Sequence, residues 1–199
     1  FIIAVKPKDV LGVVEEIVEM YNPTLIISIA AGVSTKSIEK IAPEFPVVRA
    51  MPNLAAHVGE SATAICSGRN VDEKNVEMTN RILSSIGTVE TVDEKQMNLL
   101  TALSGSGPAY FYLLSEYLAK AATELGLDEK TAKLLSEQTF IGAAKTLEEQ
   151  KVNAEELRAS VTSPGGTTQA AIEDFENNDL YKTVLSAVKA AKERADSLA

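Results

Sequence analysis

Short apolar runs alternate with helix-length amphipathic segments through the first half of the chain. Runs of roughly five residues, typical of strands covered on both faces, occur at 1–5, 24–29, 46–50, 63–66 and 88–92. Segments with helical periodicity lie between them, at 9–20, from Ser34 or Thr35 to before Pro43, and at 72–85. This order indicates a parallel sheet built from right-handed crossovers.

The pattern changes at Asp93, after which no strand-like run appears. Helices are expected at 93–103, 108–125, 129–149, 154–162, 168–176 and 179–197. The helix over 108–125 is apolar on more than one face, so it needs cover on several sides, and a subunit interface would supply part of that cover. We therefore predict an α/β fold: a partial Rossmann-type parallel sheet domain at 1–92, followed by an all-helical domain at 93–199.

The first residues suggest that the sequence starts partway into a longer protein. FIIAV begins at Phe1, in the middle of what reads as a buried strand, without a Met or a lead-in. Natural chains seldom begin inside a core strand, so we expect further residues before Phe1.

Composition and charge narrow the function classes. The net charge is -9, and the 19 Lys and Arg residues form no dense patch, which argues against a nucleic-acid partner. One cysteine, Cys66, and one histidine, His57, exclude an internal disulfide and a Cys- or His-rich metal site, so we expect no metal and a reducing cytoplasm. The most apolar helix carries charges at Glu116, Lys120 and Glu124, so no membrane span is expected.

Three strand ends carry loops that suit a ligand. Open parallel sheets bind ligands beyond the carboxyl ends of their strands, where this sequence places VKP at 5–7, AAG at 30–32 and MPN at 51–53. Each loop alone is adequately explained as a strand-ending turn, but three on one edge favour a binding site without identifying its ligand. The glycine fingerprint of dinucleotide-binding proteins is missing, so a pyrophosphate loop would have to precede Phe1.

The segment SVTSPGGTTQAAI, at 160–172, is the second candidate site. Gly165 and Gly166 permit close approach to bare backbone amides, and Thr167 or Thr168 is placed to cap the helix that follows. Hydroxyls, amides and a helix N-terminus together would make a compact carboxylate site. A plain helix–helix turn with a good N-cap explains the same residues.

The combination of FIIAVKP, ISIAAGVS, RAMPN, TALSGSGPAYFYLLSE and SVTSPGGTTQAAI, in this order, closely resembles pyrroline-5-carboxylate reductase over essentially the whole chain. The resemblance implies a Rossmann domain followed by a helical dimerisation and substrate-binding domain. It further implies a homodimer, or a higher oligomer of dimers, that reduces 1-pyrroline-5-carboxylate to L-proline with NADPH or NADH. Roughly 60 to 70 residues, a βαβ unit and a following helix, would then be missing before Phe1.

The resemblance also assigns residues. It implies cofactor contacts at the three strand-end loops, namely Ala4, Val5, Lys6, Pro7, Ala30, Ala31, Gly32, Met51, Pro52 and Asn53. It implies substrate contacts at Ser163, Gly165, Gly166, Thr167 and Thr168, with Glu94 near the ring nitrogen. Hydride would reach C5 of the cyclic imine while the nitrogen is protonated, and Thr168 is the best candidate for the catalytic residue that hydrogen-bonds that nitrogen.

Three positions depart from the family's usual pattern. Leu54-Ala55 follows MPN where Thr-Pro is usual, Lys151 stands where an acidic residue is common, and Ser160 stands where an amide side chain is common. These changes bear on cofactor preference and substrate affinity, and they leave the SPGGTT segment intact.

Two other functions fit parts of the sequence. A β-hydroxyacid dehydrogenase has a similar layout, but it needs a catalytic lysine early in the first long helix, and 107–118 contains none. A paralogue that only dimerises or regulates would fit the absence of a glycine fingerprint from these residues.

Overall fold

The structure is a computed structural model, and it describes residues 1–198 of the 199-residue chain. The chain forms two compact units. We call Phe1–Pro108, together with the last helix from Ala187 onward, the sheet unit, and Ala109–Ser186 the helical unit. The last strand ends at Thr91, next to the predicted boundary at residue 92. That this boundary separates two domains stays a prediction.

The sheet unit is built on five strands in the order β1-β2-β3-β4-β5. They are β1 (Ile2–Ile3), β2 (Ile26–Ser28), β3 (Val47–Met51), β4 (Ser61–Ser67) and β5 (Gly87–Thr91). Each expected apolar run contains a strand, but the prediction of an all-parallel sheet is wrong at one pair. β3 and β4 run antiparallel, with Arg49 opposite Cys66, and the other neighbours are parallel. Only residues 52–60 join β3 to β4, too few for a crossover helix.

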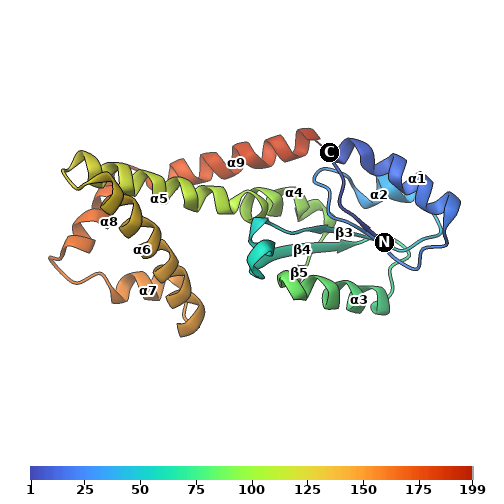
Figure 1. Ribbon diagram of the computed structural model, residues 1–199, viewed down its shortest axis with the longest axis horizontal. Coiled ribbons are helices and arrows are strands. Elements are labelled where there is room, and N and C mark those ends of the chain that lie inside the picture. The colour runs from blue at the N-terminus through green and yellow to red at the C-terminus, as the bar shows by residue number, and fades with distance from the viewer. Residues whose placement is uncertain (199) are drawn as a thin grey trace. The chain divides into compact units, whose positions relative to one another are not determined.

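Helices cover both faces of this sheet because alternate strand residues are apolar on each side. Ile26 and Val47 belong to a buried cluster that includes residues of α1 (Val10–Met20) and α2 (Thr35–Glu39). Ile27 and Val48 face the other way and pack with Leu83 of α3 (Glu73–Leu83), which lies along one face of the sheet in Figure 1. The continuous hydrophobic strands are thus explained by burial on both sides.

Side chains cap the starts of two of the expected helices. The Ser34 side chain accepts from Ser37 N at the start of α2, and Asp72 forms a reciprocal capping box with Asn75 at the start of α3. Asp9 precedes α1 but makes no side-chain cap, because a 3-10 turn, η1 (Pro7–Asp9), already leads into the helix.

The helix expected at 93–103 is divided into three short pieces. A 3-10 turn, η4 (Glu94–Gln96), leads into α4 (Met97–Leu100), which continues as a π-helical segment, η5 (Thr101–Gly105). Met97 is fully buried in a cluster with Ala64 and Cys66 of β4. The remaining short 3-10 turns are η2 (Leu54–Val58) and η3 (Ser84–Ile86).

Helices alone make up the helical unit, as the sequence predicts. They are α5 (Gly107–Glu124), α6 (Glu129–Gln150), α7 (Ala154–Ser160), α8 (Thr167–Asn177) and the first part of α9 (Leu180–Leu198). Large apolar side chains of α5 remain about half exposed in the single chain, among them Phe111, Leu114 and Leu118. Among residues 1–198, no helix is both long and apolar enough to cross a bilayer.

Candidate functional site

The three loops expected to bind cofactor lie at one edge of the sheet. Ala4–Pro7 follows β1 and Ala30–Gly32 follows β2, while Met51 is the last residue of β3 and leads into Pro52 and Asn53. Since β1, β2 and β3 are parallel, with Ile3 opposite Ser28 and Ser28 opposite Arg49, their carboxyl ends are adjacent. The loop after β2 turns at Gly32, whose φ of 77° favours glycine. The structure therefore brings these three segments together.

Exposure differs among these loops. The side chains of Ala4, Val5, Lys6 and Pro7 are exposed, whereas Ala31, Gly32, Met51, Pro52 and Asn53 are half-buried. Ala30 is buried. The small or cyclic side chains among these residues suit the close approach of a planar ring or a ribose. The Lys6 amine adds a cationic donor for a phosphate or hydroxyl.

Asn53 uses its side chain to hold its own loop. Its Oδ1 accepts from Ala55 N at 3.1 Å, and its Nδ2 donates to the Ser104 carbonyl at 3.0 Å. Its backbone N–H donates to Ser61 Oγ at 3.0 Å. The MPN loop is therefore tied to both β4 and the π-helical segment η5, and the amide of Asn53 serves that attachment.

The π-helical segment also approaches Met51. A Cβ on Gly105 would lie 3.1 Å from Met51 Cε, tighter than an ordinary van der Waals contact. A single π turn widens the helix locally and is often found at functional sites. Here the π-helical segment places Gly105 next to Met51 at the end of β3, a contact that was not predicted from the sequence.

The glycine-hydroxyl loop in the helical unit differs from its predicted form. The N-cap of α8 is Gly166, without a side-chain cap, so the prediction that Thr167 or Thr168 caps this helix is wrong. Both threonines lie inside the first turn instead. A helix begins here because Gly166 has an extended backbone and its carbonyl accepts the first helical hydrogen bond, from Ala170 N at 3.2 Å.

The two glycine amides of this loop already have acceptors. Gly165 N donates to Gln169 Oε1 at 2.6 Å, and Gly166 N donates to the Ser163 carbonyl at 2.9 Å. Gly165 has a φ of 70°, so the turn requires a residue that tolerates the left-handed region. The expectation of bare amides is wrong for both, and an anion here would use the first-turn amides of α8, which have no acceptor within the helix.

Thr168 is the half-buried threonine of the pair, whereas Thr167 is exposed. Ser163 is also exposed, at the start of the same turn. All three belong to the helical unit, together with Gly165 and Gly166. Their roles toward a substrate stay predictions.

Glu94 belongs to the sheet unit and has protein partners for both carboxylate oxygens. Oε1 accepts from Thr35 N at 2.7 Å, and Oε2 accepts from Thr35 Oγ1 at 2.6 Å. Arg49 Nη1 lies 3.7 Å from Oε1. That Glu94 lies near a ring nitrogen stays a prediction.

Sequence analysis missed Arg49 and Asn98. The Arg49 side chain is only 4% exposed, and its Nη2 donates to Asn98 Oδ1 at 3.1 Å. Its Nε has no hydrogen-bond partner among the described residues. An arginine inside an otherwise apolar strand, VVRAM, was the available signal, because a buried charge requires a partner.

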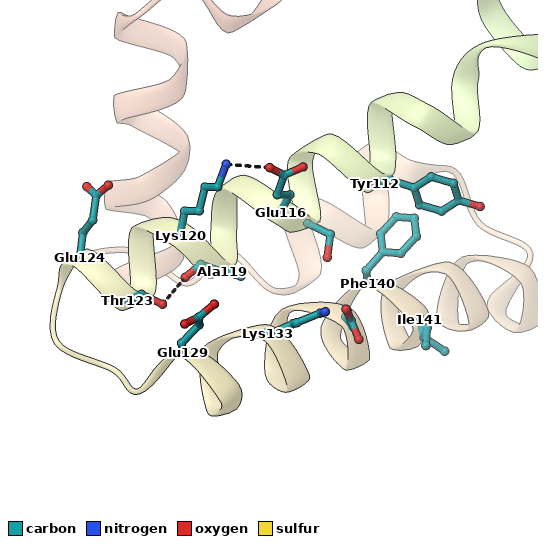
Figure 2. A pocket seen from close by; sticks show the side chains of 12 residues that line it. Tyr112, Glu116, Ala119, Lys120, Thr123, Glu124, Glu129, Lys133, Phe140 and Ile141 are labelled. Atoms are coloured by element: carbon teal, nitrogen blue, oxygen red, sulfur yellow. Dashed lines mark hydrogen bonds and ion pairs between the residues drawn. The ribbon is translucent and has the colours of Figure 1, made fainter.

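A groove of about 1000 Å³ lies between α5 and α6, and it contains none of the predicted site residues. Figure 2 shows Tyr112, Phe140 and Ile141 gathered at one end, with Glu116 and Lys120 joined by an ion pair further along α5. Ser136 Oγ donates to the Ser115 carbonyl at 2.6 Å, which joins the two helices across it. The groove is an open surface of the helical unit, lined by both apolar and charged side chains.

Within the described part of the chain, no group of three or more His, Cys, Asp or Glu side chains is placed to hold a metal ion. Cys66 is a buried free thiol. Burial raises its pKa to about 12, with nearby Glu94 acting in the same direction and Arg49 opposing it. A thiol of this kind is a packing residue, not a nucleophile.

Comparison with known proteins gives a consistent result. Residues 94–198 match the family model for pyrroline-5-carboxylate reductase dimerisation. Pyrroline-5-carboxylate reductase 1 of Bacillus subtilis is 39% identical over 99% of this chain and 67% of that protein. The Pseudomonas aeruginosa reductase is 39% identical over 100% of this chain and 74% of its own length.

Solved structures agree with these matches. The pyrroline-5-carboxylate reductase of Coxiella burnetii superposes with a TM-score of 0.93 at 41% identity, covering 100% of this chain and 75% of that chain. The Plasmodium falciparum enzyme, solved with NADP bound, gives a TM-score of 0.86 at 33% identity, covering 99% of this chain and 76% of the other.

Proposed function

The chain belongs to the pyrroline-5-carboxylate reductase family, and from that premise we propose that it reduces 1-pyrroline-5-carboxylate to L-proline with NADPH or NADH. One observation carries the proposal beyond family membership. The chain combines three adjacent strand ends suited to a dinucleotide with a separate glycine-hydroxyl turn at the start of α8, suited to a small carboxylate.

We assign the cofactor to the edge of the sheet formed by Ala4–Pro7, Ala30–Gly32 and Met51–Asn53. The adjacency of these loops supports this assignment, and a relative of this fold is solved with NADP bound. Asn53 would act by fixing the loop at the end of β3, since both ends of its amide are already engaged. When bound, the reduced nicotinamide supplies the hydride that adds to C5 of the imine.

We assign the substrate to Ser163, Gly165, Gly166, Thr167 and Thr168. The first-turn amides and the dipole of α8 favour a carboxylate at this helix start. Thr168 would donate a hydrogen bond to the ring nitrogen and relay to it a proton taken from solvent water as hydride adds to C5. A hydroxyl is a weak acid by itself, so the main contribution of this loop is to orient the ring.

A homo-oligomer completes the proposal. The matched family model is a dimerisation domain, and the half-exposed apolar side chains of α5 would be covered by a second copy. The proposed oligomer is a homodimer, or a higher oligomer of dimers. The expected cytoplasmic location rests on the single, buried thiol of Cys66 and also stays a prediction.

The decisive experiment uses the full-length protein, including whatever residues precede Phe1. Oxidation of NADPH and of NADH is followed with 1-pyrroline-5-carboxylate, and the product is identified as L-proline by mass. Turnover with either cofactor supports the proposal. A protein that binds NADPH yet turns over only β-hydroxyacids, or nothing, would replace it with one of the two alternatives considered from sequence.

A further inference from the structure

Glu94 makes a two-point contact with a single residue of a different element. Thr35, the first residue of α2, donates both its backbone N–H and its hydroxyl to the Glu94 carboxylate, at 2.7 and 2.6 Å. Hydrogen bonds to an ionised acceptor at such distances are about twice as strong as neutral ones. Thr35 is 4% exposed and lies 59 residues before Glu94 in sequence, so this contact fixes two distant segments together.

An ion pair with Arg49 links Glu94 to a chain of hydrogen-bonded side chains. Arg49 lies beside the carboxylate and donates to Asn98 Oδ1, and Asn98 Nδ2 donates to Asp196 Oδ1 at 2.9 Å. Asp196 is in turn paired with Lys192 at 2.7 Å. The chain therefore runs from the end of α9 through α4 and β3 to the start of α2, all within the sheet unit.

The position of Thr35 gives this contact a functional consequence. It follows the segment Ala30–Ser34, which connects β2 to α2 and contains the glycine turn assigned to the cofactor. Ser34 Oγ accepts from Ser37 N at 3.1 Å and so caps α2. Glu94 Oε1 accepts from the backbone N–H of Thr35, the first residue of the same helix. The loop is thus fixed at its far end by a residue that is remote in sequence.

We propose that Glu94 is a positioning residue for the cofactor, acting through Thr35 to hold the Ala30–Ser34 loop in its binding conformation, with Arg49 fixing the carboxylate. This rests on the proposed assignment of that loop to the cofactor. In this role Glu94 acts through the two hydrogen bonds that its carboxylate accepts from Thr35, and not through contact with the substrate ring nitrogen.

The experiment compares four variants of the full-length protein with the unaltered enzyme. Glu94→Gln removes the charge, Thr35→Val removes the hydroxyl donor, and Thr35→Ser restores it. Glu90→Gln is the matched control, since Glu90 is an exposed carboxylate on β5. NADPH dissociation constants are measured by fluorescence titration, and kcat and the KM for 1-pyrroline-5-carboxylate are measured at saturating NADPH.

We expect Glu94→Gln and Thr35→Val each to weaken NADPH binding about tenfold, the effect of one charge-assisted hydrogen bond. The substrate KM and the kcat at saturating NADPH should change less than about twofold. Thr35→Ser and Glu90→Gln should match the unaltered enzyme.

Three results would overturn the proposal. One is normal NADPH binding by Glu94→Gln together with a raised substrate KM, which would place Glu94 at the substrate. Another is normal NADPH binding by Thr35→Val, which stays informative even if Glu94→Gln fails to fold. The third is equal weakening by Thr35→Ser. If the unaltered enzyme binds NADPH at this loop but does not reduce the imine, the proposed function fails and the positioning role can still be read from binding alone.

Discussion

Asn53 Nδ2 donates to the Ser104 carbonyl across 3.0 Å, joining the loop at the end of β3 to the π-helical segment before α5. The opposite end of the same amide, Oδ1, accepts from Ala55 N. One side chain thus determines both the shape of the MPN loop and its attachment. A carboxylate of equal size in its place can do only the first.

The substitution Asn53→Asp tests this attachment. It keeps the acceptor for Ala55 N but sets a carboxylate oxygen against the Ser104 carbonyl, where two acceptors repel each other. An acceptor that loses its donor in a buried contact costs about 1 to 3 kcal/mol. This contact is part-buried, so the cost is smaller, and the loop is expected to shift to avoid it. We expect the rate of hydride transfer, measured by single-turnover oxidation of NADPH, to fall about tenfold or more.

Asn70→Asp is the matched control for that experiment. Asn70 also donates its side-chain amide to a backbone carbonyl, that of Pro43 at 2.8 Å, but on an exposed loop outside the proposed site. Its variant should transfer hydride at the normal rate. Equal slowing in both variants would mean that Asn53 contributes only to general stability.

Thr168→Ala should lower kcat for 1-pyrroline-5-carboxylate by about 100-fold, the low end of the range for losing a proton donor. The NADPH dissociation constant should stay within about twofold, since the assigned role of Thr168 is toward the imine nitrogen. Thr168→Ser keeps the hydroxyl and should recover most of the activity. Steady-state kinetics with direct NADPH titration separates the two effects.

Thr183→Ala provides the reference for Thr168, because Thr183 is an exposed threonine on α9 with no assigned role in the site. Unchanged turnover in Thr168→Ala would remove Thr168 from catalysis and leave the first-turn amides of α8 as the main contribution of this loop.

Leu114→Asp should dissociate the oligomer. Leu114 and Leu118 are 47% and 48% exposed at successive turns of α5, and a second copy would bury them both. A carboxylate in that interface would be desolvated without a partner. Light scattering should report the mass of a single chain for Leu114→Asp. The control Met20→Asp alters a 70% exposed residue of α1 and should leave the oligomer intact. An unchanged mass for Leu114→Asp would place the interface elsewhere.

The strands were predictable because most of the positions that the sheet buries carry apolar residues, although Arg49 and Thr63 are buried as well. Val47 and Val48 pack into different clusters on opposite faces, and a continuous hydrophobic run records this directly. The direction of β4 was not predictable in the same way. Its residues fit a buried strand in either direction, and only the short connection over 52–60 shows that it returns antiparallel.

The turn before α8 was predictable from the sequence, but its hydrogen-bond partners were not. Gly165 and the threonines marked a special turn before α8, but the turn is closed by Gln169, whose side chain takes the Gly165 amide. The pairing of Glu94 with Thr35 joins residues 59 apart in sequence, and no local pattern encodes it. Side-chain partners of this kind depend on tertiary packing, which hydrophobic periodicity does not resolve.

The Cys66 thiol should resist modification in the folded protein. It should also lower the free energy of unfolding as the pH rises above about 9. Its pKa is raised from 9.0 to about 12, chiefly by burial, so the fold favours the protonated thiol. The stabilisation is fully present below pH 9.0 and is lost as pH rises toward about 12, because the unfolded chain then releases the proton more readily.

A disulfide reagent at pH 8 should label the native protein far more slowly than the protein in guanidinium chloride. Chemical unfolding between pH 8 and 11 should show a steeper loss of stability in the unaltered protein than in Cys66→Ala, where the other titrating groups are the same. Equal slopes, or rapid labelling of the native thiol, would show that this strand opens to solvent and that burial does not protect Cys66.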